Sequence, residues 1–451
     1  MNKRFEFSVT AVRLGRVLSL ATGAVLAVSA LADDAVPALT TPITGTFAFQ
    51  QTLPDLDEDM RQQLGFGRGL FNQLWNSAPA RDTTLDGLGP TYNQSSCAAC
   101  HLRNGRGTAP TRDGQRLRGM LVRLSVATPE GSVPHPVYGD QLQESAILGV
   151  EPEGRVQLRW VEEARVLDDG TRIALRRPAI TLDQLKFGAL DDAETSLRIA
   201  PQLVGMGLLE AVPAATLEAL AATPRPDGIS GQINRLPQGS GRLGWKANVT
   251  DLTQQSAAAF VGDMGLTSAW HEQENCPPAQ TACTAVTFEF PDVSDEQMHA
   301  VALYQALLAV PATRGQDDPA VQQGAALFEA AGCQHCHLPQ LETGPQALHP
   351  LLANRQFAPY TDLLLHDMGE GLADGRPDGQ ANGRQWRTAP LWGLGLVPVV
   401  NEQLDLLHDG RARSVLEAIL WHGGEGAAAA ARVAGMSAAE RAALEAFVLS
   451  R

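Results

Sequence analysis

The chain lacks a long hydrophobic run beyond its first 32 residues. No later stretch approaches the roughly 18 consecutive apolar residues that a membrane-spanning helix needs. In residues 1–32, basic side chains precede the apolar run VLSLATGAVLAVSALA, which ends in an Ala-x-Ala cleavage site before Asp33. This pattern predicts a signal peptide cleaved after Ala32 and a periplasmic mature protein that does not span the membrane. An uncleaved N-terminal anchor is the alternative.

Basic residues are also in short supply. The 451 residues include 35 Lys and Arg against 50 Asp and Glu, which gives a formal net charge of −15. Residues 1–32 contain four basic side chains and one acidic, so the mature chain is near −18. Nucleic-acid-binding proteins need a basic surface. The charge therefore argues against a nucleic-acid partner and suits cationic partners.

Cysteine is sparse, and its spacing does not suit a disulfide framework. Of the six cysteines, four lie in two Cys-x-x-Cys-His motifs, CAACH at 97–101 and CQHCH at 333–337. This motif is the attachment signature of c-type haem, in which both thiols add to the haem vinyl groups and the histidine binds the iron. The motifs predict two covalent haem c groups, attached and ligated by Cys97, Cys100 and His101 and by Cys333, Cys336 and His337.

Other interpretations of the cysteines fit less well. A zinc site would have to join two pairs that are far apart in the sequence, and a redox Cys-x-x-Cys does not require a histidine directly after it. The remaining two, Cys276 and Cys283, flank the Pro-rich loop PPAQTA. In an exported protein they predict a disulfide, with free thiols as the alternative.

The two haem motifs belong to an internal repeat. A Gly-x-x-Leu-Phe phrase precedes each motif, and an Arg-x-Ala-Pro phrase, a turn and a capped helix follow it. The phrases are GRGLFNQLW (67–75) and GAALFEAAGC (324–333), then LRIAPQLVGMGLLEAVP (197–213) and WRTAPLWGLGLVP (386–398). The repeat predicts a mainly α fold with two tandem cytochrome-c-like domains.

The predicted domains differ in size. The signal peptide, 1–32, is followed by an N-terminal domain over 33–285 and a C-terminal domain over 286–451. The first domain contains a β-rich insertion over about 110–196, with a hairpin signal at Asp168-Asp169-Gly170. The insertion fits a lid, a partner surface or plain structural padding.

The chain resembles the di-haem oxidoreductase family, also called thiol oxidoreductases or putative peroxidases. The most specific phrases are CAACHLRNGRG, GLLEAVP, PYTDLLLHDMGEGLADGR, WRTAPLWGLG and LLHDGRARSVLEAILWHGGEG. The family is related to bacterial di-haem cytochrome c peroxidases and to MauG-type oxidases. The resemblance implies a high-spin N-terminal haem for chemistry with peroxide or dioxygen and a six-coordinate C-terminal haem for electron transfer. It also implies a redox partner such as a small cytochrome or cupredoxin, and a Ca²⁺ ion between the domains.

His422 is the expected second iron ligand of the C-terminal haem. Ser414 and Glu417 predict a capped helix that Gly423 ends, with His422 on its apolar face. In the related peroxidases a similar phrase ends in the methionine that is the sixth ligand, and His422 occupies that position. The resemblance thus implies a bis-histidine haem. The alternatives are that His408, His366 or Met368 is the ligand, or that His422 is an ordinary core histidine.

The resemblance also indicates catalytic residues for the N-terminal haem. Trp245 matches a tryptophan between the two haems, Gln255 matches a pocket glutamine, and Asp263 matches a distal glutamate but is one methylene shorter. A carboxylate there can take and return a proton. Asp263 could instead be a helix-end carboxylate, and Glu210 is the fallback acid.

The sequence lacks the removable distal histidine that these peroxidases have shortly after the first haem motif; the next histidine is His135. The N-terminal haem is therefore either open or bound by another residue, such as Met120 or His135. Three functions follow as hypotheses: a peroxidase or oxidase, a MauG-like or rubber-oxygenase-like enzyme that acts on a protein or polymer, and an electron-transfer cytochrome or redox sensor without turnover.

Overall fold

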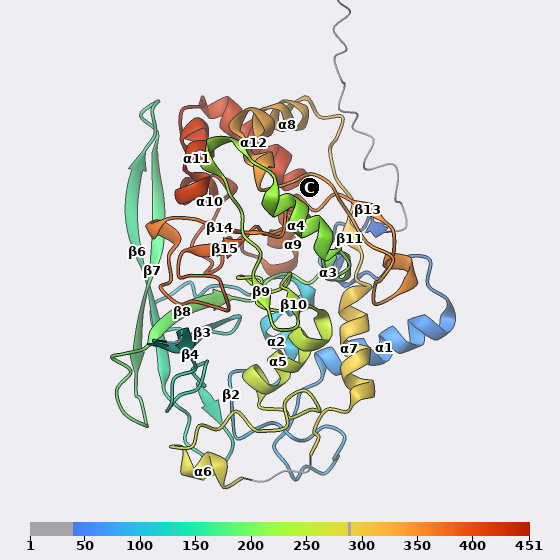
Figure 1. Cartoon of the computed structure of the whole chain (residues 1–451), viewed down its shortest axis with the longest axis vertical. Coiled ribbons are helices and arrows are strands. Elements are labelled where there is room, and N and C mark those ends of the chain that lie inside the picture. The colour runs from blue at the N-terminus through green and yellow to red at the C-terminus, as the bar shows by residue number, and fades with distance from the viewer. Residues whose placement is uncertain (1–38, 130, 287–289) are drawn as a thin grey trace, which may run out of the picture. The chain divides into compact units, whose positions relative to one another are not determined.

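The computed structural model describes residues 39–129, 131–286 and 290–451 (Figure 1). The predicted signal peptide, residues 1–32, lies outside these ranges. Within them, none of the helices combines the length and the apolar character that are needed to cross a lipid bilayer.

The described residues form mostly short helices and strands, with six strands in succession from β3 to β8 and runs of helices before and after them. The α-helices are α1 (Glu58–Asn72), α2 (Cys97–Cys100), α3 (Met206–Glu210), α4 (Ala214–Ala222), α5 (Leu252–Met264), α6 (Thr281–Thr284), α7 (Asp295–Ala306), α8 (Pro319–Ala331), α9 (Val397–Asn401), α10 (Val415–Leu420), α11 (Ala427–Ala434) and α12 (Ala438–Ser450). The strands are β1 (Thr40–Thr41), β2 (Thr91–Tyr92), β3 (Met120–Thr128), β4 (Gly131–Val133), β5 (Ser145–Ala146), β6 (Arg155–Val166), β7 (Arg172–Asp183), β8 (Glu194–Ile199), β9 (Arg235–Leu236), β10 (Gly239–Ser240), β11 (Val310–Pro311), β12 (Leu341–Glu342), β13 (Gln356–Phe357), β14 (Leu365–Asp367) and β15 (Gln385–Arg387).

The prediction of a mainly α fold made of two cytochrome-c-like domains is wrong. Helix accounts for 32% of the structure and strand for 19%, and no cytochrome-c domain architecture is seen among the described residues. The strands form small separate sheets: β4-β3-β8 has three strands, and the others pair two by two. Frequent glycine and proline, 43 and 28 residues, keep most helices short. The domain boundaries at 33–285 and 286–451 stay a prediction.

The region over 110–196 forms the longest strands. β3 pairs with β8, and β6 pairs with β7 in a twelve-residue antiparallel ribbon that turns at Asp168-Asp169-Gly170, as the hairpin signal predicts. Figure 1 shows this ribbon running along one side of the protein toward α10 and α11. Ion pairs tie it to the C-terminal half: Arg176 contacts Asp405 at 3.0 Å, and Arg441 contacts Asp169 at 2.7 Å. The region therefore braces the second half of the chain.

Each Cys-x-x-Cys-His motif lies next to a pair of crossing helices, and the repeated Gly-x-x-Leu-Phe phrase has the same role in both pairs. α1 crosses α7 at Gly67, where an added Cβ would lie 2.1 Å from the Ala300 carbonyl oxygen. α8 crosses α12 at Gly324, where a Cβ would lie 2.0 Å from the Ala443 carbonyl oxygen. The phenylalanine four residues on then packs near the motif histidine, with ring centroids 6.3 Å apart for Phe71 and His101 and 6.4 Å apart for Phe328 and His337.

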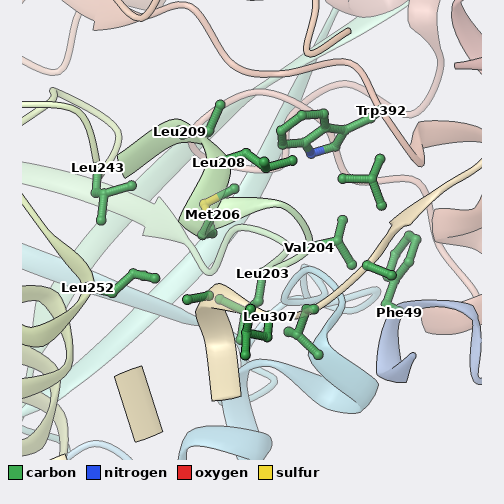
Figure 2. Packing of buried hydrophobic residues seen from close by; sticks show 14 of the residues in the cluster. Phe49, Leu203, Val204, Met206, Leu208, Leu209, Leu243, Leu252, Leu307 and Trp392 are labelled. Atoms are coloured by element: carbon green, nitrogen blue, oxygen red, sulfur yellow. The ribbon is translucent and has the colours of Figure 1, made fainter. Parts of the chain in front are cut away.

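The segment that contains the first Arg-x-Ala-Pro phrase continues into the hydrophobic core. Figure 2 shows Leu203, Val204, Met206, Leu208 and Leu209 packed among Phe49, Leu243, Leu252, Leu307 and Trp392. These contacts come from segments far apart in the chain, so they fix the backbone around Pro201. That backbone lies directly behind the first haem motif, as the next section describes.

Candidate functional site

Two cavities contain the two Cys-x-x-Cys-His motifs. The first, of about 270 Å³, is lined by Cys97, Cys100 and His101. The second, of about 190 Å³, is lined by Cys333, Cys336 and His337. These four cysteines are unpaired, whereas Cys276 and Cys283 form the disulfide that their spacing predicts. The motif thiols are therefore free to react with a group that enters each cavity.

Each motif folds into one tight turn. Ser96 caps the first turn by accepting a hydrogen bond from the Ala99 N–H at 3.2 Å. In both motifs the histidine N–H donates to the carbonyl of the first cysteine at 2.9 Å. The spacing of the motif thus brings the two thiols and the imidazole to one cavity wall.

Three histidines in the cavities share one hydrogen-bonding pattern. Nδ1 of His101 donates to the Pro201 carbonyl at 2.8 Å, Nδ1 of His337 to the Tyr360 carbonyl at 2.9 Å, and Nδ1 of His422 to the Ala418 carbonyl at 2.7 Å. Burial lowers the pKa of all three, to about 4 for His101 and His337. Each imidazole is therefore neutral with its lone pair on Nε2, which is the state of an iron ligand oriented by a backbone carbonyl.

The three alternatives to His422, namely His366, His408 and Met368, also line the second cavity, and the two histidines among them have different surroundings from His422. His366 is held by carboxylates on both sides, with Nδ1 2.7 Å from Glu425 and Nε2 2.9 Å from Asp362. Burial lowers its pKa, but hydrogen bonds led by the one to Asp362 outweigh burial and raise the pKa to about 12, so the ring has no free lone pair. The His408 ring is stacked on Trp386 at 3.6 Å and points Nε2 toward Asp409.

Helix α5 presents the predicted catalytic residues to the first cavity. Asp251 caps its start by accepting from the Gln254 N–H at 2.9 Å, and Gln255 and Asp263 both line the cavity. Oδ1 of Asp263 accepts a hydrogen bond from Nε2 of Gln141 at 2.7 Å. Burial raises the pKa of this carboxyl group. The arrangement places a proton acceptor of raised basicity in the same cavity as His101.

Trp245 lies in the wall between the cavities. Its indole Nε1 donates to the Ile199 carbonyl at 2.7 Å, and the Arg106 guanidinium carbon lies 5.3 Å from its ring centroid. Among the residues that the structure describes, the ones that line both cavities are Arg106, Trp245, Arg387, Ala389 and Pro390. A side chain in this wall is in contact with whatever fills either cavity.

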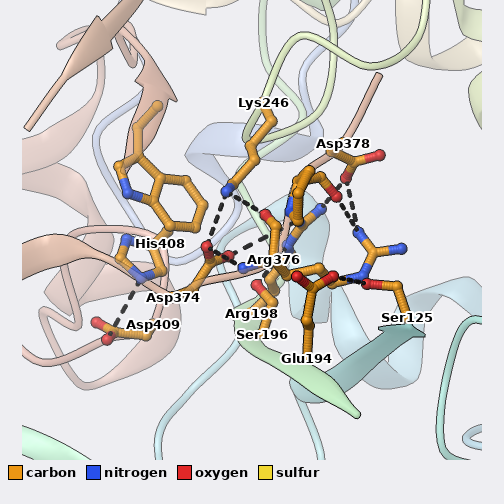
Figure 3. Close-up of polar contacts among 12 residues, drawn as sticks. Ser125, Glu194, Ser196, Arg198, Lys246, Asp374, Arg376, Asp378, His408 and Asp409 are labelled. Carbon is orange, nitrogen blue, oxygen red and sulfur yellow. Dashed lines mark hydrogen bonds and ion pairs between the residues drawn. The ribbon is translucent and has the colours of Figure 1, made fainter. Parts of the chain in front are cut away.

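A buried polar network lies next to this wall (Figure 3). Lys246, which follows Trp245, is fully buried and donates to Asp374 at 2.8 Å and to the Arg376 and Asn382 carbonyls. Its ammonium nitrogen lies 4.4 Å from the ring centroid of Trp386. Arg198 and Asp378 pair at 2.8 Å in the same network. Paired charges of this kind hold the loop over 374–382 against the segment that contains Trp245.

Some sequence-based candidates lie outside both cavities. Glu210 accepts a hydrogen bond from the Leu252 N–H at 3.0 Å, and burial raises its pKa to about 7. His135 accepts from the Val137 N–H at 3.1 Å through Nδ1. Neither residue lines either cavity, whereas Met120 lines the first. Met120 is thus placed to contact a group in the first cavity, and His135 is not.

Sequence reasoning missed several polar residues of the cavities. Arg123 and Gln141 line the first cavity, Arg198 lines it from β8, and Arg106 and Arg387 line both. Arg198 and Arg387 are the arginines of the repeated Arg-x-Ala-Pro phrase, so that repeat was a usable signal. Gln141 and Arg123 come from the 110–196 region, where no motif marks them.

The predicted Ca²⁺ site has no counterpart in the described ranges. Across residues 39–129, 131–286 and 290–451, no three His, Cys, Asp or Glu side chains gather in a way that could hold a metal ion.

The structure thus has two cavities, each lined by one Cys-x-x-Cys-His motif. Comparison with protein families agrees: the chain belongs to the di-haem oxidoreductase family, because the model described as "di-haem oxidoreductase, putative peroxidase" matches residues 38–127 and 131–451. Comparison with curated proteins found no match, and comparison with solved structures found none either.

Proposed function

We propose that the protein is an exported, periplasmic di-haem c-type oxidoreductase that reduces peroxide or dioxygen at the first cavity and receives electrons through the second. The difference between the cavities carries this proposal. The first has one histidine, His101, together with a buried carboxyl group, among its described lining residues. The second contains two neutral histidines, His337 and His422, in the same hydrogen-bonding pattern.

The residues present fit two covalent haems. Cys97 and Cys100 would hold one haem through thioether bonds, and Cys333 and Cys336 the other. His101 would bind the first iron, while His337 and His422 would both bind the second. When bound, the haem groups supply redox-active iron for the reduction of peroxide or dioxygen.

The chain's own residues would handle protons and electrons around these groups. Asp263 would take a proton from a substrate in the first cavity and return it to the leaving oxygen. Its buried carboxyl group, which lines that cavity and has a raised pKa, supports this role. Gln255 would orient the substrate by a hydrogen bond. Trp245, in the wall shared by both cavities, would relay electrons between the two sites. The electron donor would be a small cytochrome or cupredoxin.

Mass spectrometry and EPR of the mature protein test this proposal. We expect two haem adducts on a chain that starts at Asp33, with one adduct lost in Cys97→Ala/Cys100→Ala and the other in Cys333→Ala/Cys336→Ala. The oxidised protein should give a high-spin EPR signal that peroxide changes. Absence of both adducts in a host able to attach haem would overturn the proposal.

One observation favours a second function, an electron-transfer cytochrome or redox sensor. Met120 lines the first cavity and could bind the first iron through its thioether. In that case the oxidised protein would lack a high-spin signal, would show a thioether charge-transfer band and would not respond to peroxide. Met120→Ala would then create the high-spin signal that the enzyme should have at the start.

A further inference from the structure

Among the residues that the structure describes, two buried arginines lack the ion pair that the other buried arginines have. Within the described residues, six arginines are buried: Arg106, Arg198, Arg376, Arg387, Arg411 and Arg441. Four of them pair with a carboxylate, at 2.8 Å for Arg198 and Asp378, 3.1 Å for Arg376 and Asp378, 2.6 Å for Arg411 and Asp409, and 2.7 Å for Arg441 and Asp169. Arg106 and Arg387 have no carboxylate at ion-pair distance among the described residues.

Both unpaired arginines bond to backbone carbonyls instead. Arg106 donates from Nε to the Asp405 carbonyl at 2.9 Å and from Nη2 to the Leu407 carbonyl at 2.8 Å. Arg387 donates from Nε to the Gly244 carbonyl at 2.9 Å and from Nη1 to the Thr388 carbonyl at 3.1 Å. Nη1 of Arg106 and Nη2 of Arg387 have no hydrogen-bond partner in the described part of the chain.

The nearest carboxylates are committed elsewhere. The side chain of Asp405 pairs with Arg176 at 3.0 Å, and that of Asp362 pairs with Arg225 at 2.5 Å and with His366 at 2.9 Å. Burial lowers the pKa of Arg106 and Arg387 only to about 10, so both guanidinium groups are charged at neutral pH. Each is therefore a buried cation that feels the charge of a nearby carboxylate but forms no ion pair within the described residues. A buried charge without such a pair is costly unless another anion is present.

These two arginines are also the charged residues that line both cavities. The missing anion should therefore come from the groups that fill the cavities. Haem carries two propionate groups, and the planar guanidinium fork matches the geometry of a carboxylate.

We propose that Arg106 and Arg387 are the counter-ions of the haem propionates and hold them at the wall that the two cavities share. This inference rests on the proposed function, in which haem fills both cavities. A cation near a haem favours the ferrous state, because reduction removes one positive charge from the iron. Since each arginine lines both cavities, each should raise the reduction potential of both haems.

The test uses the holoprotein with two attached haems and measures both potentials by spectroelectrochemistry. In Arg106→Gln and in Arg387→Gln, we expect the ferrous-to-ferric ratio of both haems at a fixed potential to fall by about tenfold, which is about 59 mV for a one-electron couple. Arg441→Gln is the matched control, because it removes a buried, paired arginine that lines neither cavity. Its ratios should stay within about twofold of wild type.

Lysine variants distinguish the effect of the positive charge from that of the guanidinium hydrogen bonds to a propionate. Arg387→Lys and Arg106→Lys keep the charge but lose the fork, so potentials should stay near wild type while the propionate bending modes in the resonance Raman spectrum shift. The inference is overturned if two haems are attached and the glutamine variants leave both potentials unchanged. If the glutamine variants do not fold, unchanged propionate modes in the lysine variants overturn it. Wild-type protein without haem would instead overturn the proposed function.

Discussion

The hydrogen bond that Nδ1 makes distinguishes the possible iron ligands among the histidines of the second cavity. A histidine whose Nδ1–H is taken by a backbone carbonyl keeps an available lone pair on Nε2, as His337 and His422 do. His366, between Asp362 and Glu425, has neither ring nitrogen available and is held as a cation. The hydrogen bond from Nδ1 of His422 to the Ala418 carbonyl, one helical turn earlier, therefore supports an iron-ligand role for His422 as much as its position in the sequence does.

Replacing His422 by methionine should keep the second haem low-spin and raise its potential. A thioether stabilises ferrous iron relative to a second imidazole, and a rise of order 0.1 V lies within the roughly 0.8 V range that axial ligands span. Potentiometric titration and the near-infrared thioether band would measure the change. His408→Gln, which alters a stacked ring in the same cavity, should leave the axial ligands unchanged. An unaltered potential in His422→Met would make His422 a core residue.

Asp263→Asn should slow the reaction with peroxide by about 10²–10⁴-fold while both haems stay attached. Gln255→Leu should cost less, because it removes a hydrogen bond and not the proton carrier. Because burial raises the pKa of Asp263, and the carboxylate form is the base, the wild-type rate should fall as pH drops through a value above that of an ordinary aspartate. That pH dependence should vanish in Asp263→Asn.

Stopped-flow mixing with peroxide across a pH series measures both effects. Glu210→Gln is the matched control, because Glu210 is a partly buried carboxyl group with a raised pKa that lies outside the cavities. If Glu210→Gln slows the reaction and Asp263→Asn does not, the proton carrier is Glu210.

At the residue scale, the sequence could predict the residues that belong to a motif or a family phrase. The cysteines of the two Cys-x-x-Cys-His motifs lie in such phrases, as do His101, His337 and His422, and all of them line one of the two cavities. Gln141 could not be predicted, because it meets Asp263 only through the folding of the 110–196 region against α5. The same holds for Arg106, whose partners are carbonyls in the second half of the chain.

Among the secondary-structure elements, helix starts were more predictable than helix ends. Ser414 caps α10, as predicted, by accepting from the Glu417 N–H at 3.1 Å, and Ser437 and Glu440 form a capping box at the start of α12. The expected end at Gly423 is wrong, because α10 stops at Leu420 and Gly423 has a φ of −110°. A cap depends on local hydrogen bonds, whereas the end of α10 follows from the close approach of Gly423 and Gly424 to the backbone at 367–369.

The crossing of α1 and α7 makes a matched pair of glycine substitutions possible. Gly67→Ala places a Cβ 2.1 Å from the Ala300 carbonyl oxygen, so the helices must separate, and we expect a loss of about 1–3 kcal/mol in the free energy of unfolding. Gly69→Ala in the same helix meets nothing within 4 Å and should add about 0.5–1 kcal/mol. Denaturant unfolding of the holoprotein measures both. Equal effects of the two variants would contradict the close crossing.

At the scale of the whole molecule, segments from the two halves of the chain pair with each other. β1, near the start of the described chain, pairs with β11, with Thr40 opposite Val310, and Arg103 of the first haem motif region donates to the Val400 carbonyl at 2.7 Å. Pairings over such distances leave no local periodic signal, so the sequence could not predict them, whereas the internal repeat was visible. The wall that contains Trp245 is one result of this interlocking.

Trp245→Phe tests whether that wall conducts electrons. The indole lines both cavities and is held by its hydrogen bond to the Ile199 carbonyl. A smaller ring without the N–H should keep both cavities intact but change the contact between the groups that fill them. We expect the reaction of the first haem with peroxide to keep its rate, and the transfer of an electron from the second haem to become about tenfold or more slower. Trp75→Phe is the control, because Trp75 is buried against Phe260 and lines neither cavity. Stopped-flow spectra that follow the two haems separately measure each step. Equal transfer rates in wild type and Trp245→Phe would leave Trp245 as a packing residue and would place the electron path elsewhere in the shared wall.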